Sequence, residues 1–177
     1  INADGGVQSA FSITNWFWTT ETAGDTEMVT WGTNVGRQRV TWRVHQGRLR
    51  TEHGAGNLRG NTYCNDGEWH FGALTVAEGA NLRPDVTKLY LDGIEDTTFS
   101  GSGNAYNLVA NADVSIGRRA DNASRYWIGG IDDVAIYSHV LTAAEVTDIM
   151  VNTPLPFRTK ASAPSTASGT TDLVYYS

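Results

Sequence analysis

The side chains that could do acid, base or nucleophilic chemistry are scattered along this sequence. The histidines lie in four different segments, and the glutamates near them stand alone. These residues are His45, His53, His70, His139, Glu52, Glu68 and Glu95. The sequence also has no Gly-x-Ser-x-Gly elbow, no His-Glu-x-x-His pair and no phosphate loop. We therefore expect a protein that is not an enzyme.

Aromatic and planar polar side chains offer a different chemistry, the binding of sugars. The chain has six Trp and seven Tyr residues, and aromatic faces stack on the C–H side of a pyranose while planar polar groups bind its hydroxyls. The alternative is that these rings fill a core. The predicted ligand-binding residues on sheet faces are Trp18, Arg43, His45, Arg50 and His53, and those in or near loops are Tyr106, Tyr126 and Trp127.

Charge and composition exclude several classes of partner. The net charge is −6, and the 13 Lys and Arg residues form no run, which argues against a nucleic-acid partner. No apolar stretch reaches the length of about 18 residues that a membrane span needs. The single Cys64 excludes an intrachain disulfide and is expected to be buried. A start at Ile1 fits a processed chain or a domain cut from a longer one, and we expect an extracellular or cell-surface protein. An Asn-x-Ser sequon at Asn122 allows glycosylation where the host has the machinery.

Short segments with period-two alternation dominate the chain. In residues 39–45, for example, Val40, Trp42 and Val44 share one face, while Arg39, Arg43 and His45 share the other. Asp-Gly, Gln-Gly and single Gly residues separate these segments. The predicted strands are 11–18, 27–31, 39–45, 48–53, 69–76, 87–91, 95–99, 112–116, and 126–128 with 131–137. This pattern predicts an all-β, two-sheet antiparallel sandwich.

One short helix is predicted near the C-terminus. Thr142 and Glu145 have the spacing of a capping box, and Val146, Ile149 and Met150 form an apolar stripe that ends near Asn152. Residues 153–171 are rich in Pro, Ser, Ala and Thr, and 172–177 again look like a strand. We therefore expect a domain over 1–152 and an arm over 153–177.

Several segments together resemble the laminin-G-like jelly-roll family of the concanavalin A-like lectin/glucanase superfamily. They are 11–16, 66–70, 88–93, 115–118, 130–137 and 141–146. The resemblance covers about residues 10–150 and implies a jelly-roll sandwich. Glucanases of this superfamily carry a Glu-x-Asp-x-x-Glu strand, whose alternate carboxylates share one face, and this sequence has no such run. The resemblance thus implies a non-catalytic module that binds carbohydrate or a surface glycan.

The same resemblance implies a structural calcium ion at the rim of the sandwich. An Asp early in the closing strand, here Asp132, would bind it together with groups near the N-terminus, for which Asn2, Asp4 and Gly5 are the candidates. Carboxylate and carbonyl oxygens suit calcium. The alternative is that Asp132 and its neighbour Asp133 flank a bulge and hydrogen-bond locally.

Two departures from the family pattern favour a second hypothesis. Family members usually have an opening strand before the segment at Phe11, and here only residues 1–10 are available for it. The family domain also usually ends near the helix, whereas an arm follows here. An unpaired sheet edge would accept residues 172–177 of a neighbour. On this hypothesis the chain is a subunit of a homo-oligomeric cell-surface or filamentous assembly.

Overall fold

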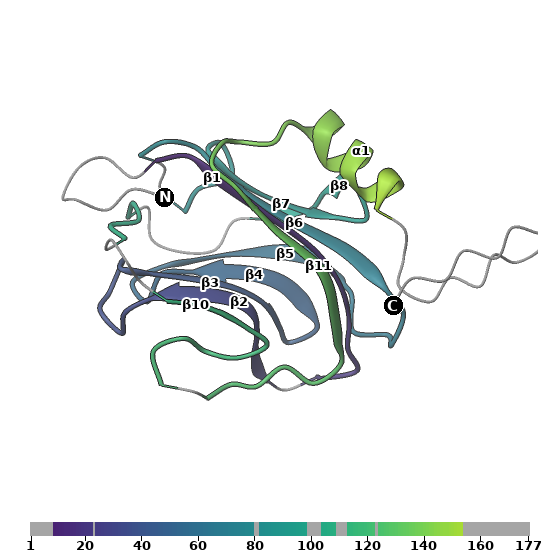
Figure 1. Cartoon of the computed structure of the whole chain (residues 1–177), viewed down its shortest axis with the longest axis horizontal. Coiled ribbons are helices and arrows are strands. Elements are labelled where there is room, and N and C mark those ends of the chain that lie inside the picture. Colours follow the sequence, from purple (N-terminus) through teal and green to yellow (C-terminus); the bar gives the residue numbers. More distant parts are fainter. Residues whose placement is uncertain are drawn as a thin grey trace, which may run out of the picture.

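Two antiparallel sheets stack face to face in the computed structural model (Figure 1). The structure describes residues 9–22, 24–79, 82–98, 104–108, 113–122 and 124–153. In spatial order, the five-stranded sheet contains β11 (Gly130–Tyr137), β1 (Phe11–Trp18), β6 (His70–Val76), β7 (Thr87–Leu91) and β8 (Ile94–Glu95). The six-stranded sheet contains β10 (Val114–Ile116), β2 (Asp25–Gly32), β3 (Arg39–His45), β4 (Arg48–Glu52), β5 (Asn57–Tyr63) and β9 (Thr97–Thr98). The predicted sandwich fold is confirmed.

The strands differ from the prediction in three places. β5 was not predicted, because its sequence offers one buried apolar side chain, Leu58, among polar residues and a glycine. The expected strand at 126–128 is wrong, since these residues have no regular structure. The expected return strand at 95–99 is divided: β8 pairs with β7, whereas β9 pairs with β5, so the chain changes sheets at Asp96.

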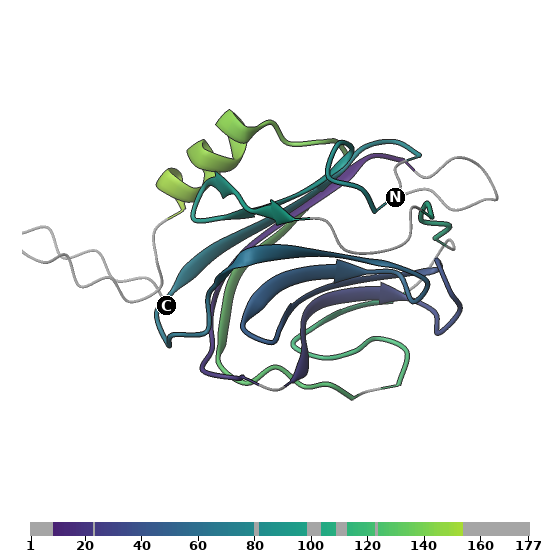
Figure 2. The same ribbon diagram turned by 180° about the vertical axis from the view of Figure 1, so that it is seen from behind.

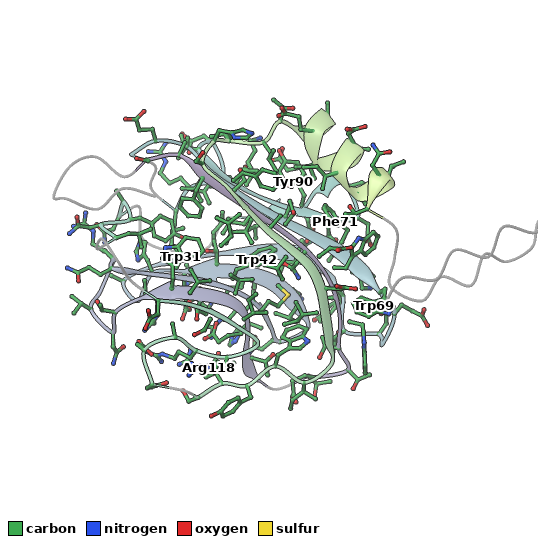
Figure 3. The ribbon with its side chains drawn as sticks, viewed as in Figure 1. Trp31, Trp42, Trp69, Phe71, Tyr90 and Arg118 are labelled. Atoms are coloured by element: carbon green, nitrogen blue, oxygen red, sulfur yellow. The ribbon has the colours of Figure 1, made fainter. Side chains whose placement is uncertain are left out.

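The main core lies between the sheets and is rich in aromatic side chains. Figure 3 shows Trp31 and Trp42 there, and both are buried. Trp42 is completely buried, and its Nε1–H donates to Asn15 Oδ1 at 2.7 Å. Val40 and Val44 join Trp42 in this core, so the alternation predicted for residues 39–45 is confirmed.

A second apolar cluster covers the outer face of the five-stranded sheet. The helix α1 (Ala143–Asn152) packs there, above Phe71 and Tyr90 (Figures 1 and 3). The predicted capping box is present: the Glu145 amide donates to Thr142 Oγ1, and the Thr142 amide donates to Glu145 Oε2. Val146 is fully buried in this cluster. The five-stranded sheet is therefore covered on both faces.

Some predictions fall wholly or partly outside the described residues. These are the strand-like segment 172–177, the arm after Thr153, and the calcium donors Asn2, Asp4 and Gly5. The division into 1–152 and 153–177 therefore stays a prediction, although α1 does end at Asn152. Cys64 is buried as expected, and burial raises the pKa of its thiol to about 12. Within the described ranges, no helix has the length and apolar character that crossing a membrane requires.

Candidate functional site

The outer face of the six-stranded sheet carries charged side chains in rows that cross the strands. Antiparallel register places Asp25, His45, Arg48 and Tyr63 in one such row. The next row contains Glu27, Arg43, Arg50 and Arg59. Side chains directly opposite each other on neighbouring strands lie close enough to interact. We call this surface the arginine face; it also includes Arg39, Glu52 and, from the segment above it, Arg119, Asp121 and Arg125.

The segment between β10 and β11 lies over part of this face. Figure 2 shows it passing along the side of the six-stranded sheet that is remote from the other sheet. Thr30 Oγ1 donates to the Arg118 carbonyl at 3.0 Å, and the Glu27 amide donates to the Arg125 carbonyl at 3.1 Å. These bonds hold the segment against β2. As a result, the arginine face is covered near β2 and open toward β4 and β5.

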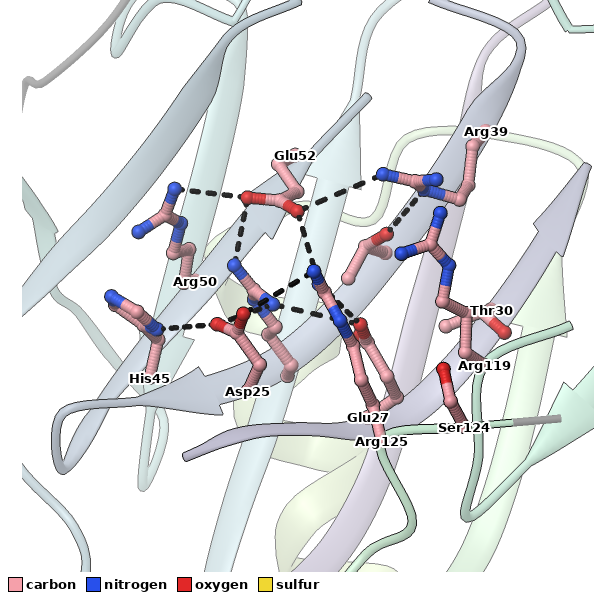
Figure 4. Close-up of polar contacts among 12 residues, drawn as sticks. Asp25, Glu27, Thr30, Arg39, His45, Arg50, Glu52, Arg119, Ser124 and Arg125 are labelled. Carbon is pink, nitrogen blue, oxygen red and sulfur yellow. Dashed lines mark hydrogen bonds and ion pairs between the residues drawn. The ribbon is translucent and has the colours of Figure 1, made fainter. Parts of the chain in front are cut away.

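Two carboxylates organise the covered part of the arginine face (Figure 4). Glu52 pairs with Arg43 at 2.8 Å and with Arg50 at 2.9 Å. Asp25 pairs with Arg43 at 2.8 Å, with His45 at 2.9 Å and with Arg125 at 3.3 Å. Arg43, whose side chain is 2% exposed, therefore joins the two carboxylates.

A third carboxylate ties the overlying segment to β3. Asp121 accepts from Arg39 at 3.0 Å and also pairs with Arg119. Arg119 and Arg39 lower the pKa of Asp121, although burial acts in the opposite direction. Asp121 is therefore ionised at neutral pH and stabilises the covering segment on the sheet.

Burial sets the protonation states of two further groups on this face. It raises the pKa of Glu27 to about 7, although Arg43 and Arg125 act against the shift. Burial, Arg50 and Arg43 lower the pKa of His45 below its ordinary value. The His45 imidazole is therefore neutral at neutral pH and adds no positive charge to the face.

The open end of the arginine face combines an exposed ring with guanidinium groups. The Tyr63 residue is 62% exposed. The Arg48 guanidinium carbon lies 4.4 Å from the centre of the Tyr63 ring, and Arg48 Nη2 donates to Tyr63 Oη at 2.7 Å. Arg50 and Arg59 lie opposite each other on β4 and β5. This end presents the two features, a flat ring and planar donors, that sugar-binding sites combine.

The predicted ligand-binding residues are divided among three places. Arg43, His45 and Arg50 come together on the arginine face, but Arg43 is buried. His53 and Tyr106 lie in the interior, with ring centres 5.1 Å apart and the Tyr106 hydroxyl 2.9 Å from Thr51 Oγ1. Their placement fits core packing, and they are not part of the candidate site.

The remaining three predicted residues lie near the end of β1 and the start of β11. Trp127 packs edge-on against Phe17 and donates to the Gly130 carbonyl. Trp18 pairs with Gly130 across the strands, and its indole lies directly against this glycine. Tyr126 is exposed. None of the three belongs to the rows that form the arginine face.

Sequence reasoning missed Arg48, Arg59 and Tyr63 as site residues. Arg48 shares its face with Arg50 by simple alternation, so the pattern of residues 48–53 already contained it. Arg59 and Tyr63 could be placed only after β5 was recognised as a strand. Its pairing with β4 then aligns Arg59 with Arg50 and Tyr63 with Arg48.

The predicted calcium site is only partly within the described residues. Asp132 Oδ1 accepts a hydrogen bond from the Asp133 amide at 2.8 Å, at a point where the pairing of β11 with β1 shifts register. This geometry fits the alternative of a local bulge. Among the residues with described positions, no group of three or more His, Cys, Asp or Glu side chains could hold a metal ion. The calcium ion stays a prediction.

A separate titratable cluster lies at the end of the five-stranded sheet. His70 Nδ1 lies 2.7 Å from Asp92 Oδ2, and His70 Nε2 lies 3.1 Å from Asp66 Oδ1. The hydrogen bond to Asp92, the charge of Asp92 and the contact with Asp66 raise the pKa of His70. The charged imidazolium is therefore favoured in the folded state.

This cluster predicts a pH-dependent contribution to stability. A histidine whose pKa is higher in the folded state stabilises the fold fully below its unfolded value of about 6.5. The contribution is lost as the pH rises through the folded value. Thermal unfolding of wild type and His70→Gln should therefore differ most near pH 6 and least above about pH 9. An NMR titration that places the pKa of His70 at or below the unfolded value would contradict this prediction.

Comparison with known proteins assigns the family. The model of the laminin G type described as the concanavalin A-like lectin/glucanases superfamily matches residues 2–147. The chain belongs to this superfamily. The matched range contains all eleven strands described above. No curated protein sequence matches this superfamily member.

Solved structures of three similar proteins share the fold. Domain 4 of AbnA, an extracellular arabinanase of Geobacillus stearothermophilus solved with arabinotriose, is 23% identical with a TM-score of 0.56, covering 84% of this chain and 70% of that one. A putative carbohydrate-binding protein of Bacteroides ovatus is 18% identical with a TM-score of 0.62, covering 85% of this chain and 43% of that one. The CBM40 of the Ruminococcus gnavus IT-sialidase, solved with α2,3-sialyllactose, is 16% identical with a TM-score of 0.60, covering 81% and 83%.

These similarities show that the proteins share the concanavalin A-like fold, but they do not identify a ligand for this chain. Each identity is below a quarter, and one fold serves many functions, which reside in particular sites. The match spans 43% of the Bacteroides ovatus protein. What this sandwich binds must therefore be argued from its own side chains.

Proposed function

We propose that this chain is an extracellular, non-catalytic module that binds carbohydrate at the open end of its arginine face. One observation carries the proposal: the exposed Tyr63 ring lies beside Arg48, with Arg50 and Arg59 on neighbouring strand positions. The site is built on regular strands, so its side chains are held in place before a ligand arrives. Two proteins of similar fold were solved with bound saccharides, which supports this class of ligand.

The ion pairs of the arginine face support a non-catalytic role. Glycosidases need a carboxyl group that can give a proton to the leaving oxygen and a second one within reach of the sugar. Asp25 and Glu52 are both engaged by arginine side chains. Glu27 has a pKa near neutrality, but its side chain is 1% exposed and out of reach of a bound sugar.

A glycan array followed by titration calorimetry tests the proposed function. We expect wild type to bind at least one glycan, and Tyr63→Ala to weaken that binding about 10-fold, equivalent to about 1.4 kcal/mol. Arg83→Gln is the matched control, because Arg83 forms an exposed ion pair with Asp85 in another loop. An array without bound glycan, or full affinity in Tyr63→Ala, would remove the proposal.

We also propose the structural calcium ion, on the strength of the family resemblance. Calcium added to EDTA-treated protein should raise the melting temperature, because a ligand at 100 times its Kd stabilises the folded state by about 2.7 kcal/mol. Asp132→Asn should abolish this rise. Asp148→Asn on α1 is the control, since Asp148 is exposed on the helix and its carboxylate accepts a hydrogen bond from Asn152. Equal melting temperatures with calcium and with EDTA would contradict the prediction.

A second candidate function is that of an assembly subunit joined by strand exchange. One observation favours it: β10 is an edge strand of three residues on which Val114 and Ile116 are 52% and 55% exposed. We propose residues 172–177 of a neighbouring copy as the strand that this edge accepts. Size-exclusion chromatography of the full chain and of a chain cut after Thr153 tests it. Two monomers would exclude strand exchange, whereas an oligomer of the full chain alone would support it.

A further inference from the structure

The arginine face has an excess of positive charge at its open end. Seven arginines lie on this face, against the four carboxylates of Asp25, Glu27, Glu52 and Asp121. They are Arg39, Arg43, Arg48, Arg50, Arg59, Arg119 and Arg125. The face therefore holds more than half of the 13 basic residues of a chain whose net charge is −6. Such a concentration on one surface of an acidic protein calls for a reason.

The carboxylates lie where they neutralise the covered arginines and not the open ones. Each of Asp25 and Glu52 pairs with Arg43, and Asp121 pairs with Arg39 and Arg119. Within the part of the chain that the structure describes, neither Arg48 nor Arg59 pairs with a carboxylate. The positive excess is thus located at Arg48, which lies two residues from Arg50 on β4, and at Arg59, which lies opposite Arg50 on β5.

Strand register places three arginines at directly neighbouring positions of the sheet. Arg43, Arg50 and Arg59 lie directly opposite one another on β3, β4 and β5. Like charges in this arrangement destabilise a sheet. Glu52 offsets the repulsion for Arg43 and Arg50, but no described carboxylate does so for Arg59. A bound anion would supply the missing negative charge.

From this arrangement we infer that the ligand is an acidic saccharide, an inference that rests on the carbohydrate-binding function proposed above. Its carboxylate or sulfate groups are held by Arg48, Arg50 and Arg59, and a sugar ring lies against Tyr63. Neighbouring strands lie about 4.8 Å apart, and alternate residues of one strand about 6.8 Å apart. The backbone positions of the three arginines are therefore separated by about the length of one sugar unit. Guanidinium groups bind carboxylate and sulfate oxygens with paired, charge-assisted hydrogen bonds.

The test compares acidic saccharides with matched neutral ones. For carboxylate, the probes are a galacturonate oligosaccharide and its methyl ester; for sulfate, they are chondroitin sulfate and unsulfated chondroitin. We expect one acidic probe to bind at least about 10-fold more tightly than its partner, with an affinity that falls as NaCl is raised. The pair of probes that shows the preference tells whether the site binds a carboxylate or a sulfate group.

Variants assign the preference to named side chains. Arg59→Gln should reduce the preference for the acidic probe about 10-fold and leave the melting temperature near that of wild type, because Arg59 neutralises no described carboxylate. Arg59→Lys should restore part of it, and Arg83→Gln should leave it unchanged. An undiminished preference in both Arg59→Gln and Arg48→Gln would overturn the inference.

The outcomes also separate this inference from the function on which it rests. If a neutral glycan binds as well as every acidic probe and Tyr63→Ala abolishes that binding, the chain is a carbohydrate-binding module and the acidic ligand is wrong. If no saccharide binds at all, both are wrong. Tight binding of an acidic probe that depends on Tyr63 and Arg59 would support both.

Discussion

Arg43→Met is expected to lower the free energy of unfolding by about 3–5 kcal/mol, because it removes a buried guanidinium that forms ion pairs with three carboxylates. Arg43 is 2% exposed and lies 2.8 Å from both Asp25 and Glu52 and 3.5 Å from Glu27. Methionine keeps most of the side-chain volume, so the loss reports the charge and not a cavity. Chemical denaturation at neutral pH measures it.

The pH dependence of this loss identifies its cause. Arg43 and Arg125 lower the pKa of Asp25 against the opposing effect of burial. A carboxyl with a lowered pKa stabilises the fold above its unfolded value of about 3.9, and this contribution is lost as the pH falls through the folded value. The difference between wild type and Arg43→Met should therefore persist from pH 7 down to about pH 4 and shrink below about pH 4.

A surface ion pair provides the control for this prediction. Arg83 and Asp85 approach to 2.7 Å, but both side chains are more than half exposed. Exposed pairs contribute about 0–1 kcal/mol, so Arg83→Met should have little effect. If Arg43→Met also cost less than about 1 kcal/mol, the buried pairs on the arginine face would not be a determinant of stability.

Trp42→Ala is expected to be at least as damaging, with a loss of about 4 kcal/mol or more. Trp42 is completely buried between the sheets, close to Gly72, and its Nε1–H donates to Asn15 Oδ1. Removing the indole creates a cavity and also leaves the buried Asn15 oxygen without its donor. Urea denaturation monitored by circular dichroism measures the loss.

Two further variants keep this prediction testable if Trp42→Ala does not fold. Trp42→Phe retains most of the volume but not the N–H donor, so it should cost about 1–3 kcal/mol. Tyr126→Ala removes an exposed aromatic residue and should change stability by less than about 0.5 kcal/mol. Equal stability of Trp42→Phe and wild type would show that the bond to Asn15 contributes nothing.

The sequence by itself determined the features that depend on neighbours along the chain. Alternation placed Trp42 in the core and Arg43 on the opposite face, and Thr142 with Glu145 marked the start of α1. Each of these depends on residues within a few positions of one another, so a local pattern contains the whole cause. The same alternation predicted the two-sheet sandwich that the structure shows, and the family resemblance specified its jelly-roll type.

Only the tertiary structure decided which side chains form the arginine face. β5 has too few apolar residues to be recognised alone, and its pairing with β4 sets Arg59 and Tyr63 beside Arg50 and Arg48. Asp121 and Arg125 reach the face from a segment distant in sequence, because hydrogen bonds to β2 hold that segment there. Such contacts depend on strand register and on long-range packing, which no local pattern of residue types encodes.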